Sequence, residues 1–554
     1  MSLRSQSAYR VPKDTARLAK TILPKGNVYT QLYDSLSTVY MDQDFVDLFS
    51  HTGQPAEAPV RVALVTILQF AEGLSDRQAA DAVRTRIDWK YLLCLKLEDR
   101  GFHHSVLSEF RSRLLNGNAE QRLLDRLLQI CRDKQLVKER GQQRTDSTHV
   151  LGAIRALNRL ECVGETLRHT LNVLAVTVPE WLLAHSQGDW EDRYGPRVDD
   201  YRLPKSKDER IAYGEVIGRD GQSLLDTIDQ DVAYAWLRQV PAVNTLSKVW
   251  QQNFELHDGQ LRWRPAEALP KAAYFISSPY DTQARYSQKR SKTWIGYKVH
   301  LSESCDPDLP RLITHVETTP APVSDDAMTP IIHQALHDKN LLPASHLVDT
   351  GYVKAEYLVS SREGYGVELV GPTRADYHWQ ARTKTGFAAQ HFILDWQAQT
   401  ATCPAGKTSL SWTPTVDRYH NTSIKIKFSR TDCMACPSRP LCTRAKRRTL
   451  SVRPEAYARA LQAAREREQT EAFTQQYAQR AGIEGTLSQG TRAFDLRRAR
   501  YVGLAKTKLQ HILTAVALNF IRIVHWLDGQ PLAKTRQSPF VRLCRSSAVP
   551  SAAI

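Results

Sequence analysis

The chain has 554 residues, too many for one compact core, so the usual domain size predicts roughly three or four folded units. Hydrophobic residues make up 42% of the chain and charged residues 24%, which excludes wholesale disorder. The formal net charge of +16 and the pI near 9.4 favour a polyanionic partner such as nucleic acid.

Membrane insertion and a disulfide framework both conflict with the sequence. The first residues contain no apolar signal segment, and no run of about 18 uncharged apolar residues occurs later. The cysteine count of nine is odd, and five cysteines are isolated from one another, a pattern that is not typical of a disulfide scaffold. We therefore expect a cytoplasmic protein. The isolated cysteines are Cys94, Cys131, Cys162, Cys305 and Cys544.

The first 135 residues divide into a lead and a helical unit. Residues 1–40 are polar and basic without sustained periodicity, so we expect a loosely ordered lead. Residues 41–135 have helical periodicity, and Ser75 with Gln78 forms a capping box at the start of one helix. Two helices joined by a tight turn favour a DNA-binding module, although ordinary helical bundles share this outline.

Residues 140–374 predict an α/β unit with a mixed sheet. The alternation in QQRTDSTHV places Arg144, Asp146 and Thr148 on one face of a first strand. A helical insertion follows from about 152 to 275. Two strands, a helix, a strand that ends at Asp349 and a further short strand come next, an order that suits a mixed sheet covered by helices.

The remaining segments complete the expected architecture. Residues 375–450 are polar and carry four clustered cysteines, which predicts a small insertion. Residues 451–527 are helical and form the C-terminal part of the core, with Glu484 near the end of one long helix that starts at Pro454. Residues 528–554 are rich in Pro, Ser and Arg and predict a disordered tail.

Three acids stand out by position. Asp146 lies within the first strand, Asp349 ends a later strand and Glu484 lies on a late helix. Phosphoryl transfer on DNA uses two divalent cations about 4 Å apart, and Mg²⁺ prefers carboxylate oxygens. Many strand-end carboxylates are merely solvated or cap helices, so position alone does not decide between the two roles.

Three sequence blocks resemble the catalytic blocks of DDE transposases from bacterial insertion sequences. They are QRTDSTHV, HLVDTGYV and the segment with Tyr477, Arg480 and Glu484. The chain resembles insertion-sequence family eleven-eighty-two, in the group marked by a Tyr-Arg-Glu-Lys signature, over roughly residues 40–527. RALNRLECVGETLRHTL, SPYDTQARYSQKRSKTWIGYKVHLSES and EGTLSQGTRAFDLRRARYVGLAKTKLQHILTAVALNF extend the resemblance.

The resemblance implies an RNase H-like catalytic core in which Asp146, Asp349 and Glu484 bind Mg²⁺ or Mn²⁺. We expect their carboxylates to lie within about 8 Å of one another, as a two-metal site requires. Tyr477 and Arg480 share a helical face with Glu484, and Arg480 would hold a DNA phosphate, unless Arg480 and Glu484 form only an ordinary surface pair.

Three other residues bear on this interpretation. Thr491 stands where the signature has Lys, so the role of that Lys is in doubt, although the adjacent Arg492 could substitute for it. Lys298 and His300 share a face of a core strand near the acids, and we expect structural roles for both.

The activity implied is cleavage of double-stranded DNA at the terminal inverted repeats of the element, followed by strand transfer into target DNA. Both steps are in-line displacements at phosphorus, so one site can serve both without a covalent enzyme–DNA intermediate. A homodimer in the synaptic complex and no membrane partner are also expected.

The clustered thiols predict a second metal site. Cys403, Cys433, Cys436 and Cys442 supply four thiolates for a tetrahedral structural Zn²⁺, with free thiols as the alternative. The basic run from Arg444 to Arg448 lies next to them and would suit DNA contact.

Two other functions remain open at the level of sequence. The first keeps the fold, as an RNase H-like nuclease or as an inactive or host-adopted transposase that only binds DNA. The second is a zinc-containing transcription regulator, which explains the charge and the cysteines but not the spaced acids.

Overall fold

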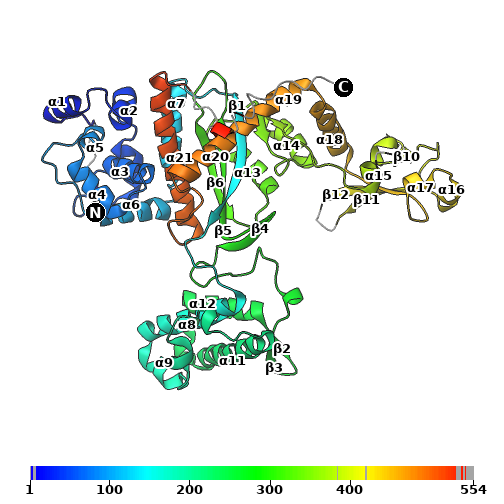
Figure 1. Ribbon diagram of the computed structural model, residues 1–554, viewed down its shortest axis with the longest axis horizontal. Coiled ribbons are helices and arrows are strands. Elements are labelled where there is room, and N and C mark those ends of the chain that lie inside the picture. The colour runs from blue at the N-terminus through cyan, green and yellow to red at the C-terminus, as the bar shows by residue number, and fades with distance from the viewer. Residues whose placement is uncertain are drawn as a thin grey trace.

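A computed structural model describes residues 2–3, 8–383, 385–417, 421–531, 538–540 and 543. A central sheet has the N-terminal helices on one side and a small β-rich insertion on the other, and a helical insertion stands apart below it (Figure 1). The tail at 528–554, expected to be disordered, lies largely outside the described residues, as does Cys544. Among the described helices, none combines the length and apolar character that a membrane-spanning segment needs.

The N-terminal unit begins earlier than the sequence suggested, and the expectation of a loosely ordered lead over residues 1–40 is wrong. Asn27 caps the second helix through a capping box, and Leu32 and Leu36 are buried against neighbouring helices. Short amphipathic helices like these gain stability from tertiary packing, which short-range periodicity does not reveal. The helices are α1 (Lys13–Ile22), α2 (Val28–Leu36), α3 (Pro59–Ala71), α4 (Asp76–Thr85), α5 (Ile87–Leu92), α6 (Ser105–Asn116) and α7 (Arg122–Asp133).

The predicted capping box at the start of α4 is present. The backbone N–H of Gln78 donates to the Ser75 hydroxyl, and the Ser75 N–H donates to the Gln78 side chain at 2.8 Å. The helix α21 (Leu504–Leu527) packs against α2, α3, α7 and the sheet, and one hydrophobic core joins all of them. The N-terminal helices therefore form one body with the sheet.

The central sheet has six strands, one more than expected, and its direction is mixed, as the sequence predicted. Five strands lie in the order β6, β5, β1, β7, β8, with β1, β7 and β8 parallel and β5 antiparallel to both β1 and β6. The added strand is β4, which forms a hairpin with the start of β5. The strands are β1 (Gln142–Leu151), β4 (Arg285–Lys289), β5 (Lys292–Ser304), β6 (Ile313–Pro320), β7 (Ser345–Val348) and β8 (Glu368–Val370).

The helices next to the sheet correct one expectation. The long helix predicted from Pro454 to Glu484 is three helices, because Thr470 caps a new helix through the N–H of Phe473 and a 3₁₀ turn covers Gln479–Ala481. Glu484 consequently lies in the first turn of a helix. These helices are α13 (Met328–Asp338), α14 (Ala355–Tyr365), α18 (Glu455–Glu468), α19 (Glu471–Ala478) and α20 (Gly482–Ala493).

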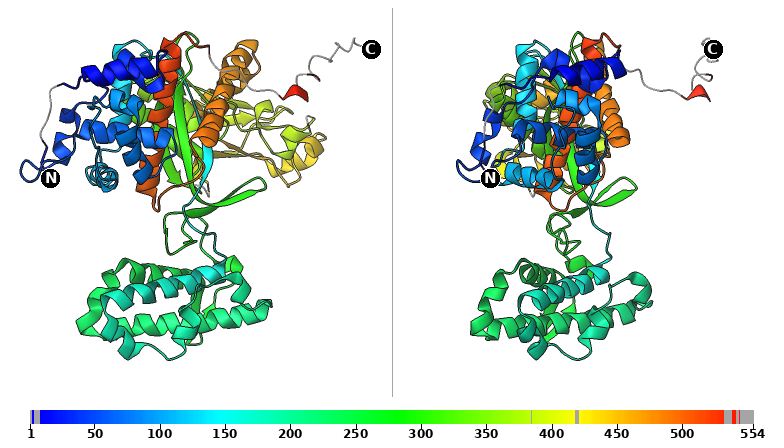
Figure 2. Two further views of the ribbon diagram at one scale, coloured as in Figure 1. Left: turned by 60° about the vertical axis from the view of Figure 1, so that its left-hand side comes forward. Right: turned by 90° about the vertical axis from the view of Figure 1, so that its left-hand side faces the viewer.

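Residues 152–275, expected to be a helical insertion, contain helices with their own core around Leu167, Leu246 and Trp250. Figure 2 shows this unit separated from the sheet by extended connections. Its elements are α8 (Arg159–Thr177), α9 (Pro179–His185), α10 (Trp190–Tyr194), α11 (Lys207–Gln230), α12 (Pro241–Asn253) and the hairpin of β2 (Phe254–His257) and β3 (Gln260–Trp263).

Residues 375–450 contain mainly short strands. Phe392, Ile426, Phe428 and Leu450 form a small core there, independent of the central sheet. The elements are α15 (Trp379–Arg382), β9 (Ile393–Asp395), β10 (Thr400–Thr402), β11 (Ser411–Val416), β12 (Thr422–Lys427), α16 (Arg430–Ala435), α17 (Arg439–Cys442) and β13 (Thr449–Val452).

Candidate active site

Asp146 and Asp349 occupy equivalent positions on neighbouring strands. The parallel pairing of β1 with β7 ends at Thr145 and Val348; Asp146 is the next residue of β1, and Asp349 directly follows the end of β7. Neighbouring strands lie about 4.8 Å apart, so this register brings together two acids that are distant in sequence. The N–H of Ser147 donates to Asp146 Oδ1 at 2.7 Å, and the N–H of Gly351 donates to Asp349 Oδ1 at 2.8 Å.

Arg480 joins Glu484 to Asp146. Its Nη2 lies 2.6 Å from Asp146 Oδ2 and its Nη1 lies 2.9 Å from Glu484 Oε1. Tyr477, one turn earlier, stacks on Phe473 with ring centroids 5.4 Å apart. Burial raises the pKa of Tyr477, and the negative charges of the three acids raise it further. The structure therefore brings all five of these sequence-predicted residues to one place.

The electrostatics of Asp146 reflect crowding of negative charge. Burial raises its pKa to about 6, and the charge of Asp349 acts in the same direction. Arg480 and the N–H of Ser147 oppose the shift without cancelling it. A buried carboxylate beside a second one is stabilised by a cation, and Arg480 supplies that charge in this structure.

Sequence reasoning missed Asp325, which belongs to the same site. Its Oδ1 accepts from Lys298 Nζ at 2.8 Å and from Ser147 Oγ at 3.1 Å. A Cβ placed on Gly351 would lie 2.8 Å from Asp349 Oδ1 and 3.2 Å from Asp325 Oδ2, so the two carboxylates face one point. The signal was visible as an acid at the start of a predicted helix, where capping is the commoner role.

Lys298 approaches the site through its contact with Asp325, whereas His300 takes the structural role expected for it. Lys298 also donates to the carbonyl of Val323 at 2.7 Å, and His300 Nδ1 lies 2.7 Å from the hydroxyl of the buried Tyr352. Burial works to raise the pKa of Asp325, but the ammonium of Lys298 outweighs it and the pKa is lowered.

A second ion cluster fixes α20 against β1. Glu303 Oε1 accepts from Arg144 Nε at 2.7 Å, and Glu303 Oε2 accepts from Arg522 Nη1 at 2.9 Å and from the Thr486 hydroxyl. Arg144 also donates to the carbonyl of Gln479 in the turn before α20, and its guanidinium lies so close to Gly482 that a Cβ there would overlap it. These contacts set the position of Arg480 and Glu484.

Arg492 lies elsewhere. It is exposed in the last turn of α20, and within the described part of the chain no ion pair joins it to the carboxylates. The hydroxyl of Thr491 donates to the carbonyl of Leu487 at 2.7 Å, within its own helix. The structure therefore does not bring either residue to the site.

The four clustered thiols gather at the small core of the β-rich insertion. Cys403, Cys433 and Cys442 pack against that core, and all four are partly buried and unbridged. Burial raises the pKa of Cys442, and the other three thiols add to the shift.

No group of three or more His, Cys, Asp or Glu side chains is placed to hold a metal ion anywhere in the described residues. The zinc expectation for the thiols is therefore unsupported. At the acids, Arg480 lies between two of the carboxylates.

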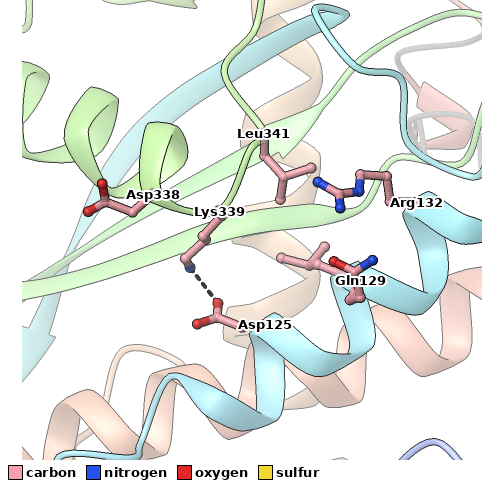
Figure 3. A pocket seen from close by; sticks show the side chains of 7 residues that line it. Asp125, Gln129, Arg132, Asp338, Lys339 and Leu341 are labelled. Carbon is pink, nitrogen blue, oxygen red and sulfur yellow. Dashed lines mark ion pairs between the residues drawn. The ribbon is translucent and has the colours of Figure 1, made fainter.

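A hollow lies between α7 and α13, where the N-terminal helices meet the core (Figure 3). The ion pair of Lys339 with Asp125 spans it at 2.8 Å.

Comparisons with known proteins match two segments of the chain to transposase domains. Residues 402–524 match the family model described as a transposase DDE domain, a range that includes Tyr477, Arg480 and Glu484. Residues 17–113 match a transposase domain of the group DUF772, which starts within α1. No curated protein matches the chain. The DDE domain implies a nuclease and strand-transferase enzyme, and the two matches together support an insertion-sequence transposase.

Proposed function

We propose that this protein is a DDE transposase that cuts and strand-transfers its own insertion-sequence DNA at Asp146, Asp349 and Glu484. The observation that carries the proposal is the register of Asp146 with Asp349, with Arg480 linking Asp146 to Glu484. An RNase H-like core fits the strand order β6, β5, β1, β7, β8, with its first acid on the central strand.

The donor chemistry fits Mg²⁺ or Mn²⁺. Asp146, Asp349, Glu484 and Asp325 offer only carboxylate oxygens, and the raised pKa of Asp146 indicates a place where a cation would be favoured. Two divalent cations held there would stabilise the attacking and leaving oxygens of a phosphoryl transfer.

The protein's own residues then bind and orient DNA. The Arg480 guanidinium is 14% exposed and linked to two carboxylates, so once these are compensated it is free to hold a phosphate next to the reacting bond. Tyr477, held by its stack on Phe473, lines this side of the site. Arg492, two turns beyond Glu484, is assigned to the DNA flank rather than to the chemistry.

We assign the binding of double-stranded DNA to two further regions. The N-terminal helical unit offers the helix-turn-helix outline of α3 and α4. Residues 375–453 hold 13 Lys and Arg against 4 Asp and Glu, a net of +9 within a chain of net +16, and the run from Arg444 to Arg448 belongs to this excess. A homodimer that pairs two terminal inverted repeats completes the proposal.

The test uses a duplex that carries the DNA bordering the reading frame, with an unrelated duplex as control. Wild-type protein in Mg²⁺ should cut at the element end and join the freed 3′-hydroxyl to a plasmid, and EDTA should stop both steps. Asp349→Asn should bind the duplex without cutting it.

Other outcomes of this test would support one of the alternative functions. Binding without cleavage by the wild-type protein supports an inactive or host-adopted DNA-binding protein. Cleavage without joining supports a nuclease, and cleavage retained by Asp349→Asn removes the DDE assignment altogether.

A further inference from the structure

The hairpin of β4 and β5 ends in a concentration of positive charge. Lys289 ends β4, Arg290 and Ser291 form the turn, and Lys292 starts β5. All four residues are exposed. Across the described residues, no carboxylate forms an ion pair with any of these three cations, although Arg144, Arg480 and Arg522 in the core each have one.

Without a bound ligand, the local structure of this tip is energetically unfavourable. Lys289 and Lys292 are direct cross-strand partners, and like charges in that position repel each other. Arg290 has a φ of 57°, in the left-handed region where glycine, asparagine or aspartate is normally found. A turn that combines like-charge repulsion with a strained long cation conflicts with local stability, and such conflicts mark functional positions.

The hairpin bends where β5 passes the end of β1 and stays in contact with that strand. At Gly296 the φ is 153°, and any Cβ would meet the backbone of Val150 and Gly152, so the two strands approach closely there. Beyond this point the Trp294 ring lies 5.5 Å from the ring of His149, which is three residues after Asp146 on β1. Figures 1 and 2 show the hairpin at the end of the sheet that faces the helical insertion.

Electrostatics agree with this placement. Burial is the main influence on the pKa of Asp146 and of Asp325, and the charge of Lys289 lowers both. Burial also lowers the pKa of His149 to about 4, with Arg497, Lys292 and Lys289 adding to the effect. The cations of the tip thus act on the residues around the carboxylates.

We propose that the tip of the β4–β5 hairpin is a clamp for the DNA phosphate backbone, formed by Lys289, Arg290 and Lys292 beside the carboxylate site. The inference rests on the proposed function, because it names how DNA is held at that site. Phosphates between the three cations would relieve their mutual repulsion, and DNA held there would run next to the carboxylate site. The clamp reads no base sequence, because phosphate contacts fix register and not identity.

The experiment compares two charge-matched triple variants. The clamp variant is Lys289→Gln, Arg290→Asn, Lys292→Gln, where Asn tolerates the left-handed backbone. The control removes three exposed cations from the helical insertion, as Arg219→Gln, Lys248→Gln, Lys271→Gln. Fluorescence anisotropy with a labelled duplex of about 40 base pairs in Ca²⁺, over a range of NaCl concentrations, gives the slope of log binding constant against log salt.

The clamp variant should lower the magnitude of that slope by about 2 to 3, since each phosphate contact contributes roughly 0.9, and the control should leave it unchanged. Thermal unfolding of the clamp variant should be unchanged or shifted upward, whereas a structural role predicts a downward shift. Lys289→Arg with Lys292→Arg should restore the wild-type slope.

Equal slopes for the clamp variant and wild type overturn the inference, as does an equal loss in both triple variants. Wild-type binding without any cleavage in Mg²⁺ counts against the proposed transposase activity, while the salt slopes still decide the clamp.

Discussion

Two ion clusters lie on the same face of β1, two residues apart, and differ in how their charges balance. At Arg144, two arginines share Glu303, whose two oxygens are both bonded and whose side chain is fully buried. At Asp146, Arg480 pairs with Asp146 and Glu484, Asp349 lies beside them, and the Glu484 side chain is 65% exposed. In the first cluster the buried carboxylate is closed off with a cation on each oxygen, whereas the second cluster is open with negative charge in excess.

This difference separates a structural ion cluster from a functional one better than residue type does. A buried carboxylate with all its partners present resists change, because removing one partner leaves an uncompensated charge. A group of carboxylates with one shared arginine is instead ready to accept an added cation. Four variants test the comparison.

The largest effect is expected for Asp146→Asn. It removes a negative charge from the open cluster and keeps the size of the side chain, so DNA cleavage in Mg²⁺ should fall by at least about 100-fold, because even groups that only orient metal ligands cost about 10–100-fold. Thermal unfolding should shift little or upward, since burial disfavours the charge that is removed. A variant that cuts its element ends at the normal rate would contradict the assignment.

Glu303→Gln should mainly lower stability, whereas Asp146→Asn should mainly lower cleavage activity. It breaks the closed cluster and leaves Arg144 and Arg522 facing each other without a counter-charge, which should lower the free energy of unfolding by about 3–5 kcal/mol. Denaturant unfolding followed by circular dichroism measures this. Glu484→Gln is the control, since its exposed side chain predicts little change in stability.

The sequence revealed the strand that carries both clusters but not their difference. Alternation in QQRTDSTHV was sufficient to place Arg144 and Asp146 on one face of a strand. The partners of these residues come from β5, the 3₁₀ turn at Gln479–Ala481 and α21, at separations of more than 150 residues. Local sequence patterns do not show which distant residues become partners, so the burial and the charge balance of each cluster could not be predicted.

The candidate site residues came from the resemblance together with strand positions, and their metal-binding roles stay predictions. Asp325 was missed because an acid in the first turn of a helix has an ordinary role there. The helix breaks at Thr470 and Gln479 were missed because the apolar periodicity continues across them. Tertiary contacts, such as Arg144 with the Gln479 carbonyl, decide where the late helices begin.

An intermediate effect is expected for Asp325→Asn, which makes the open cluster less negative. The substitution removes one charge and releases the Lys298 ammonium beside Asp349, so Mn²⁺ should bind about 10–100-fold more weakly. Calorimetric titration of the purified protein with Mn²⁺ measures the affinity directly. Asp338→Asn, at the exposed end of α13, is the matched control and should bind Mn²⁺ as the wild type does.

The smallest effect is expected for Thr486→Val, which removes one hydrogen-bonding group from the closed cluster and keeps its charges. The Thr486 hydroxyl donates to Glu303 and accepts from Arg522 Nη2 at 2.7 Å, so its loss leaves buried polar atoms unsatisfied at a cost of about 1–3 kcal/mol. Because α20 stays linked to β1 through Arg144, the Mn²⁺ affinity should not change. Unfolding and calorimetry on the same preparation separate these two readouts. If Mn²⁺ affinity falls while stability is preserved, the closed cluster takes part in cation binding and the division between the two clusters fails.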